Sequence, residues 1–136
     1  MQELIVEAKV ENLDQVNDFI NHSISEIDCS KKAMMQLGVI VEEIFVNIAS
    51  YAYPNAIGFA TVQLEVKTNP PSITLVFIDS GIQYNPLARK DPNLNVSVDE
   101  REVGGLGIYL VKNMVEEISY KYADGQNILS LTKNLN

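Results

Sequence analysis

Residues 30 to 53 form the longest segment of the chain with the periodicity of a helix. Ser30 is a suitable N-cap, and Pro54 limits the C-terminal end because residues before proline avoid helical backbone angles. At about 100° per residue, apolar side chains gather in one stripe along this helix, which must pack against a second layer of structure. The stripe consists of Met34, Leu37, Val41, Ile44, Phe45, Ile48 and Ala52.

The segments around this helix supply the second layer. Apolar runs bounded by turn residues predict strands, over residues 3–10, 59–68, 72–79, 119–123 and 127–134. Helical spacing predicts two further helices, over residues 12–27 and 106–118, the latter with Ile108, Val111, Val115 and Ile118 on one side. We therefore expect one α+β domain over residues 1–136, a two-layer α/β sandwich. Its mixed, mostly antiparallel sheet is covered on one face by helices.

The composition excludes several classes of function. A formal net charge of −8 argues against direct nucleic-acid binding, which needs clustered Lys and Arg. The single cysteine, Cys29, rules out an internal disulfide and favours a reducing, cytoplasmic compartment. The N-terminus lacks a signal-peptide pattern, and no apolar run approaches the length of a membrane span, so we expect no membrane association.

Two polar residues lie one turn apart on the long helix. Glu43 and Asn47 share a face nearly opposite the apolar stripe, while Glu42 points elsewhere. Solvent exposure is the simplest reading of such a face, but Val39 and Val46 on the same side indicate that something covers it. An amide oxygen can ligate Mg²⁺, and a carboxylate can accept a proton from a hydroxyl that attacks phosphorus.

An acidic residue ends the strand predicted over residues 72–79. Asp79 is followed by Ser80 and Gly81, a sequence that most often only forms a turn. A carboxylate at the end of a buried strand can also accept a hydrogen bond from an exocyclic amine such as that of adenine. Gly81 would then let a flat ligand approach the backbone.

A long aperiodic segment leads into a glycine-rich helix start. Gly104, Gly105, Leu106 and Gly107 open the helix predicted at 106–118, where backbone N–H groups and the helix dipole favour an anion. Simple hinging by flexible glycines explains this pattern nearly as well. The motif is neither a Walker A loop nor a dinucleotide-binding fingerprint.

Together these motifs resemble those of the Bergerat-fold (GHKL) ATPases. "EEIFVNIASYAY" is similar to their N box, and "DSGIQYNP" and "GGLGIYLVKNM" to their two glycine boxes. The small size and the "YNP" after the acid resemble most the bacterial anti-sigma-factor serine/threonine kinases. The resemblance covers about residues 3 to 133.

The resemblance implies roles for individual residues. Glu43 corresponds to the general base, and Asn47 to the Mg²⁺ ligand of a bound ATP. Asp79 corresponds to the acid that reads adenine, with Gly81 beneath the ring. Gly104, Gly105, Leu106 and Gly107 correspond to the phosphate-binding segment. Tyr51 stands near the nucleotide where many relatives have histidine, and Arg101 is the nearest arginine to the second glycine box.

The segment of about residues 86 to 103 corresponds to an ATP lid in this family. The resemblance implies an ATP-dependent transferase of transcription regulation. The implied substrate is an anti-sigma-factor antagonist, and the implied sequestered partner is a sigma factor. The resemblance also implies a homodimer. A nucleotide-gated binding module with little or no phosphoryl transfer is the alternative, and a domain with remnant motifs a third.

Overall fold

The computed structural model describes residues 1–88 and 106–136, and these residues form the predicted order of strands and helices. The strands are β1 (Gln2–Glu7), β2 (Phe59–Thr68), β3 (Pro71–Asp79), β4 (Glu117–Ala123) and β5 (Gln126–Asn134). The α-helices are α1 (Leu13–Ser23), α2 (Lys31–Tyr51) and α3 (Leu106–Met114). Two 3-10 helices, η1 (Val10–Asn12) and η2 (Pro86–Ala88), complete the described elements.

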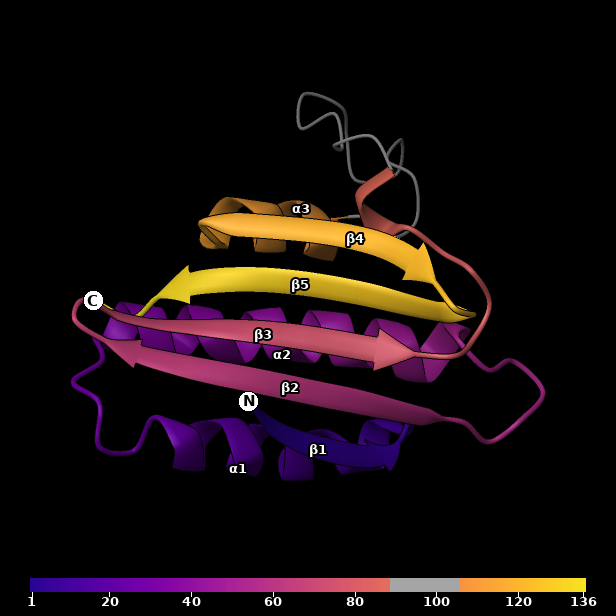
Figure 1. Ribbon diagram of the computed structural model, residues 1–136, viewed down its shortest axis with the longest axis horizontal. Coiled ribbons are helices and arrows are strands. Elements are labelled where there is room, and N and C mark those ends of the chain that lie inside the picture. Colours follow the sequence, from indigo (N-terminus) through magenta and orange to yellow (C-terminus); the bar gives the residue numbers. More distant parts are fainter. Residues whose placement is uncertain (89–105) are drawn as a thin grey trace.

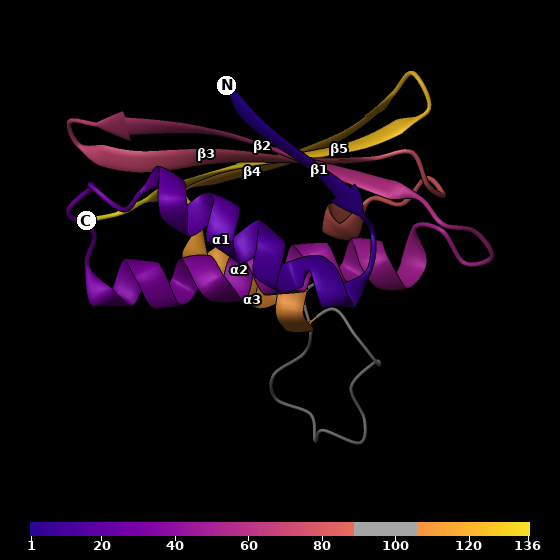
Figure 2. The ribbon, with the colours of Figure 1, turned by 90° about the horizontal axis from the view of Figure 1, so that it is seen from below.

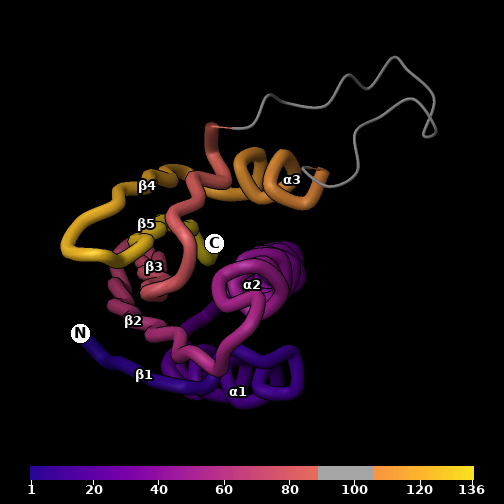
Figure 3. The backbone as a smooth tube through the Cα atoms, turned by 90° about the vertical axis from the view of Figure 1, so that its right-hand side faces the viewer, coloured from indigo at the N-terminus to yellow at the C-terminus, as the bar shows by residue number. Residues whose placement is uncertain are grey.

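The strands form one sheet in the order β1-β2-β3-β5-β4 (Figure 1). The three α-helices lie on one face of this sheet (Figure 2), with α2 between α1 and α3 (Figure 3). This arrangement confirms the predicted two-layer α+β sandwich. All four strand pairings in the described residues are antiparallel, so the parallel component of the expected mixed sheet is not found there.

The core lies between α2 and the sheet. Most of the predicted stripe of α2 is buried, including Val41 and Phe45, and Ile48 is half-buried. The expectation for Met34 is wrong, since its side chain is 37% exposed. At this end of the helix the buried stripe follows Ala33, Leu37 and Ile40, which turns Met34 outward.

The third helix is shorter than predicted. It ends at Met114 and not at residue 118, because two groups from β5 take over at this point. The Lys133 ammonium donates to the carbonyl of Met114 at 2.7 Å, and the amide of Glu116 donates to the carbonyl of Thr132 at 2.9 Å. Ile118 therefore lies in β4, opposite Leu131, and not on the helix.

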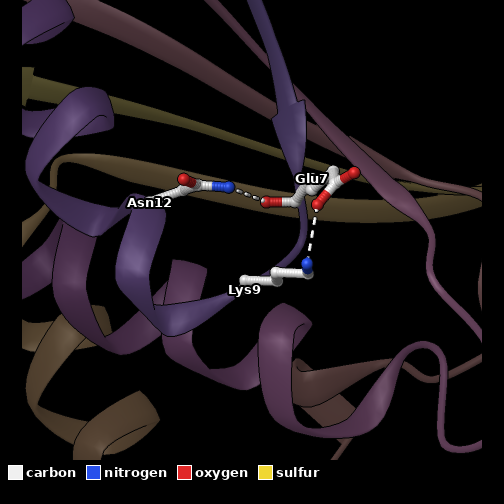
Figure 4. Close-up of polar contacts among 3 residues, drawn as sticks. All are labelled: Glu7, Lys9 and Asn12. Carbon is white, nitrogen blue, oxygen red and sulfur yellow. Dashed lines mark hydrogen bonds and ion pairs between the residues drawn. The ribbon is translucent and has the colours of Figure 1, made fainter.

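The first two elements also end earlier than expected. The hydroxyl of Ser23 donates to the carbonyl of Ile20 at 2.6 Å at the end of α1, a bond that competes with helix continuation. After β1 the chain turns into η1, and the Asn12 side chain donates to the carbonyl of Glu7 at 2.9 Å (Figure 4). Lys9 pairs with the Glu7 carboxylate at 2.9 Å, and this hydrogen bond raises the pKa of Lys9.

Helix α2 passes a simple test for a membrane-spanning segment. Contrary to the sequence-based expectation, it is long and apolar enough to cross a bilayer by length and composition alone. Core helices of soluble proteins pass the same test, and α2 packs its buried side against the sheet. Its apolar composition is therefore explained by the core.

Candidate functional site

A cavity of about 450 Å³ opens between α2, the start of α3 and one end of the sheet. Its lining is mostly apolar, with a few polar side chains, which is typical of a small-molecule site. Three of the predicted site residues, Asn47, Tyr51 and Asp79, contribute to this lining. The other lining residues are Ile44, Ile48, Ala52, Phe77, Ile82, Gln83, Tyr84, Pro86, Ile108, Tyr120, Asn127 and Leu129.

Asp79 is a buried carboxylate at the floor of the cavity. It is the last residue of β3 and is only 7% exposed. Its Oδ1 atom accepts hydrogen bonds from the amide of Gly81 at 3.0 Å and from the Asn127 side chain at 2.9 Å. Among the described residues, Oδ2 has no hydrogen-bond partner. A buried acceptor without a partner is costly, so this oxygen is suited to a donor from a ligand.

Asn127 was not singled out from the sequence, although it lies directly opposite Asp79 in the β3–β5 pairing. Its side chain is buried and binds four groups. Nδ2 donates to Asp79 Oδ1 and, at 2.9 Å, to the carbonyl of Ile82. Oδ1 accepts from the amide of Tyr84 at 3.1 Å and from the hydroxyl of Tyr120 at 2.6 Å. The only signal in the sequence was a polar residue at an inward-facing strand position.

Gly81 joins the end of β3 to the end of α2. A Cβ at this position would overlap the carbonyl and the side chain of Ala52, while the amide of Ile82 donates to that carbonyl at 2.9 Å. Gly81 itself does not line the cavity. The structure thus gives a packing reason for glycine here, besides the predicted approach of a flat ligand.

Tyr53 ties the same junction to β2. Its hydroxyl accepts from the amide of Ser80 at 2.8 Å and donates to the carbonyl of Phe59 at 2.7 Å. Burial raises the pKa of Tyr53, and the nearby Asp79 charge adds to the rise, although the Ser80 amide opposes it. The hydroxyl stays protonated near neutral pH and can make both bonds.

Glu43 and Asn47 lie on the side of α2 that faces α3. Both side chains are half-buried, so the solvent-exposed reading of this face is wrong, whereas Glu42 is exposed as expected. The Glu43 carboxylate touches Gly107 so closely that a Cβ on Gly107 would overlap it. Asn47 lines the cavity one turn further along. The two predicted motifs on α2 and α3 therefore meet at one place.

The remaining predicted residues divide into two groups. Tyr51 is 67% exposed at the cavity mouth, and Leu106, 41% exposed, begins α3. Arg101, Gly104 and Gly105 lie outside the described residues. So does the predicted lid of residues 86–103, except for its first three residues, which form η2.

The arrangement suits a flat heterocycle with an attached amine. The apolar walls can hold the ring, and Asp79 Oδ2 can accept from the amine. The described residues contain no group of three or more His, Cys, Asp or Glu side chains that could hold a metal ion. A cation here would thus depend on ligand oxygens and on an amide such as that of Asn47, which suits Mg²⁺.

The protein family that the chain matches is consistent with a nucleotide site of this kind. Residues 6–133 match the histidine kinase-like ATPase domain. The chain belongs to this family. The match confirms the predicted superfamily, and membership of an ATPase family supports the use of ATP.

Two curated relatives of this ATPase domain are named as protein kinases. The chain is 29% identical to the serine/threonine-protein kinase BtrW of Bordetella bronchiseptica over 105 residues, which cover 77% of the chain and 73% of the relative. It is 22% identical to the serine-protein kinase RsbW of Bacillus mycoides over 100 residues, which cover 71% of the chain and 61% of that relative. Both names agree with the predicted kinase branch.

Solved structures share the fold. The RsbU and RsbW domains of Rv1364c from Mycobacterium tuberculosis align with a TM-score of 0.62 and 14% identity over 99% of this chain. A blue-light-activated histidine kinase domain from Erythrobacter litoralis EL346 aligns with a TM-score of 0.54 and 16% identity over 96% of this chain. The alignments span 33% and 62% of those two chains, respectively.

Proposed function

We propose that this domain is an ATP-dependent serine/threonine kinase that regulates transcription through an anti-sigma-factor antagonist. The observation that carries the proposal is the buried Asp79 carboxylate at the floor of an apolar cavity, with one oxygen bound by the protein and the other available. The membership of an ATPase family and the names of the two relatives support it.

The base of ATP fits the end of the cavity at β3 and β5. The exocyclic amine of adenine would donate to Asp79 Oδ2, and Tyr51 and Tyr84 would stand at the rim. Guanine carries a carbonyl at the equivalent place, which would face the carboxylate without a proton between them. The cavity therefore favours adenine nucleotides.

The phosphates belong at the other end, where α2 meets α3. Leu106 and Gly107 begin α3. The first turn of this helix presents backbone N–H groups and the positive end of the helix dipole. Asn47 would ligate Mg²⁺, which supplies charge neutralisation on the phosphate oxygens when bound. Glu43, in contact with Gly107, would take the proton of the attacking serine or threonine hydroxyl.

The partners follow from the same proposal. The phosphate acceptor would be a small antagonist protein. This domain would also sequester a sigma factor. The net charge of −8 suits a protein partner better than nucleic acid. We further propose a homodimer that works in the cytoplasm, in keeping with the single cysteine.

The direct test is incubation of the protein with γ-labelled ATP, Mg²⁺ and candidate antagonists encoded close to its gene. We expect label on a serine or threonine of one antagonist, and none with GTP as donor. Calorimetry with a non-hydrolysable ATP analogue runs in parallel. Binding of the analogue without transfer to any antagonist would favour the nucleotide-gated binding module, and absence of binding would refute both functions.

A further inference from the structure

Asn127 bonds four groups at the end of the cavity proposed for the adenine base, which is termed the base end. Its four bonds reach Asp79 on β3, Ile82 and Tyr84 on the following segment, and Tyr120 on β4. A side-chain amide has two N–H donors and two acceptor positions, so this set uses its full capacity. Asn127 therefore has no bonding capacity left for a ligand.

The bonding partners fix the orientation of this amide. The backbone N–H of Tyr84 can only donate, and the carbonyl of Ile82 can only accept. Oδ1 of Asn127 must therefore face Tyr84, and Nδ2 must face Ile82 and Asp79. Burial raises the pKa of Tyr120, and the nearby Asp79 charge adds to the rise, although a backbone hydrogen bond opposes it. The hydroxyl thus remains a donor to Oδ1 at neutral pH.

This orientation determines how Asp79 can be used. Oδ1 of Asp79 accepts from two donors, Nδ2 of Asn127 and the amide of Gly81. Oδ2 is the oxygen that remains for the cavity. The same amide also anchors Ile82 and Tyr84, whose side chains form part of the cavity wall.

We propose that Asn127 is a positioning residue that makes the site selective for a 6-amino purine. It holds Asp79 so that Oδ2 faces the cavity as an acceptor. It also fixes Ile82 and Tyr84, which form the cavity wall beside that oxygen. Tyr120 supports it by fixing the amide. This inference rests on the proposed adenine site and adds a residue that does not contact the base.

The test compares the affinities of ATP and inosine triphosphate, which carries a carbonyl in place of the amine, on the whole protein. The wild type should prefer ATP. In Asn127→Ala, Asp79 loses one of its two donors and the wall loses two anchors, so the ATP preference should shrink about tenfold, the scale of one hydrogen bond to a charged group. A residue that only supports the fold would lower both affinities in the same proportion.

Two further variants keep the test decisive. Tyr120→Phe removes one of the four bonds and leaves the ring in place, so it should fold and reduce the preference two- to fivefold. Ser130→Ala, on the same strand but facing away from the helices, should leave both affinities unchanged. An unchanged preference in both Asn127→Ala and Tyr120→Phe would overturn the inference while the adenine site stands. A wild type without any preference would overturn the adenine site itself.

Discussion

The two ends of the cavity are built in different ways. At the base end, Asp79 and Asn127 are buried and joined by hydrogen bonds that draw on β3, β4, β5 and the segment after β3. At the end between α2 and α3, the side chains of Glu43 and Asn47 are half-buried and make no hydrogen bond within residues 1–88 and 106–136. Glu43 lies so close to Gly107 that a Cβ on Gly107 would overlap the carboxylate.

The difference suits the two tasks of a kinase. Selecting a base needs groups that are held in one geometry before the ligand arrives, because freezing them on binding would cost affinity. Transferring a phosphoryl group needs groups that engage only when phosphates, Mg²⁺ and the acceptor hydroxyl are present. We therefore expect changes at the base end to act on binding, and changes at the α2–α3 end to act on transfer.

The largest effect is expected for Glu43→Gln. If Glu43 is the general base, phosphoryl transfer should fall by roughly 10²–10⁴ while nucleotide affinity stays within a few-fold. Single-turnover transfer and calorimetry on the same preparation measure the two quantities. Equal losses of binding and transfer would show that Glu43 is not the base, and would remove the contrast between the two ends.

Asn47→Ala is the matched comparison on the same helix face. Because Asn47 is proposed to ligate Mg²⁺, its loss should weaken nucleotide binding about tenfold or more in the presence of Mg²⁺, and little in its absence. Titrations with Mg²⁺ and with a chelator separate the two conditions. An equal loss in both conditions would contradict the metal role.

At the base end, Asp79→Asn should weaken ATP binding by about 1.5–3 kcal/mol, because the charged acceptor of the amine is lost. The affinity for GTP should change much less, so the two nucleotides become similar. Calorimetry with both nucleotides checks this. A parallel loss for ATP and GTP would show that Asp79 supports the cavity without reading the base.

Gly81→Ala sharpens the structural part of the comparison. The new methyl group would overlap Ala52, so the free energy of unfolding should fall by about 1–3 kcal/mol. Gly38 on α2 is the control, because a Cβ there meets nothing, and Gly38→Ala should stabilise by about 0.4–1 kcal/mol. Urea unfolding measures both. If both substitutions change the stability alike, the junction between α2 and β3 is not as tight as the structure indicates.

The smallest effect concerns alkaline pH. The pKa of Tyr53 is raised by burial above its unfolded value of about 10, so its contribution to stability is complete below pH 10 and is lost as the pH rises through the folded pKa. Tyr53→Phe should therefore lose less stability between pH 9 and 11 than the wild type does. Unfolding curves at these pH values give the comparison, and identical slopes would exclude a buried hydroxyl at this junction.

The sequence determined the elements and the types of chemistry. The periodicity of α2, the turns that bound the strands and the order of elements were all local patterns, and they predicted the sandwich correctly. The sequence also singled out Glu43, Asn47 and Asp79. In the structure Asn47 and Asp79 line the cavity and Glu43 contacts Gly107, while their chemical roles stay predictions. Two predicted helix ends were wrong. At Ser23 the hydroxyl of that residue competes for a helix carbonyl, and at Met114 groups of β5 bind the backbone.

Only the tertiary structure decided how the base end works. Asn127 is 48 residues from Asp79 in the chain, and its importance follows from the antiparallel register of β3 with β5. Likewise, a packing reason for glycine at position 81 appears only where the end of α2 meets β3. A sequence specifies which groups can donate, accept or fit. Which of them meet, and which oxygen of Asp79 is left for a ligand, depends on contacts between distant segments that no local pattern contains.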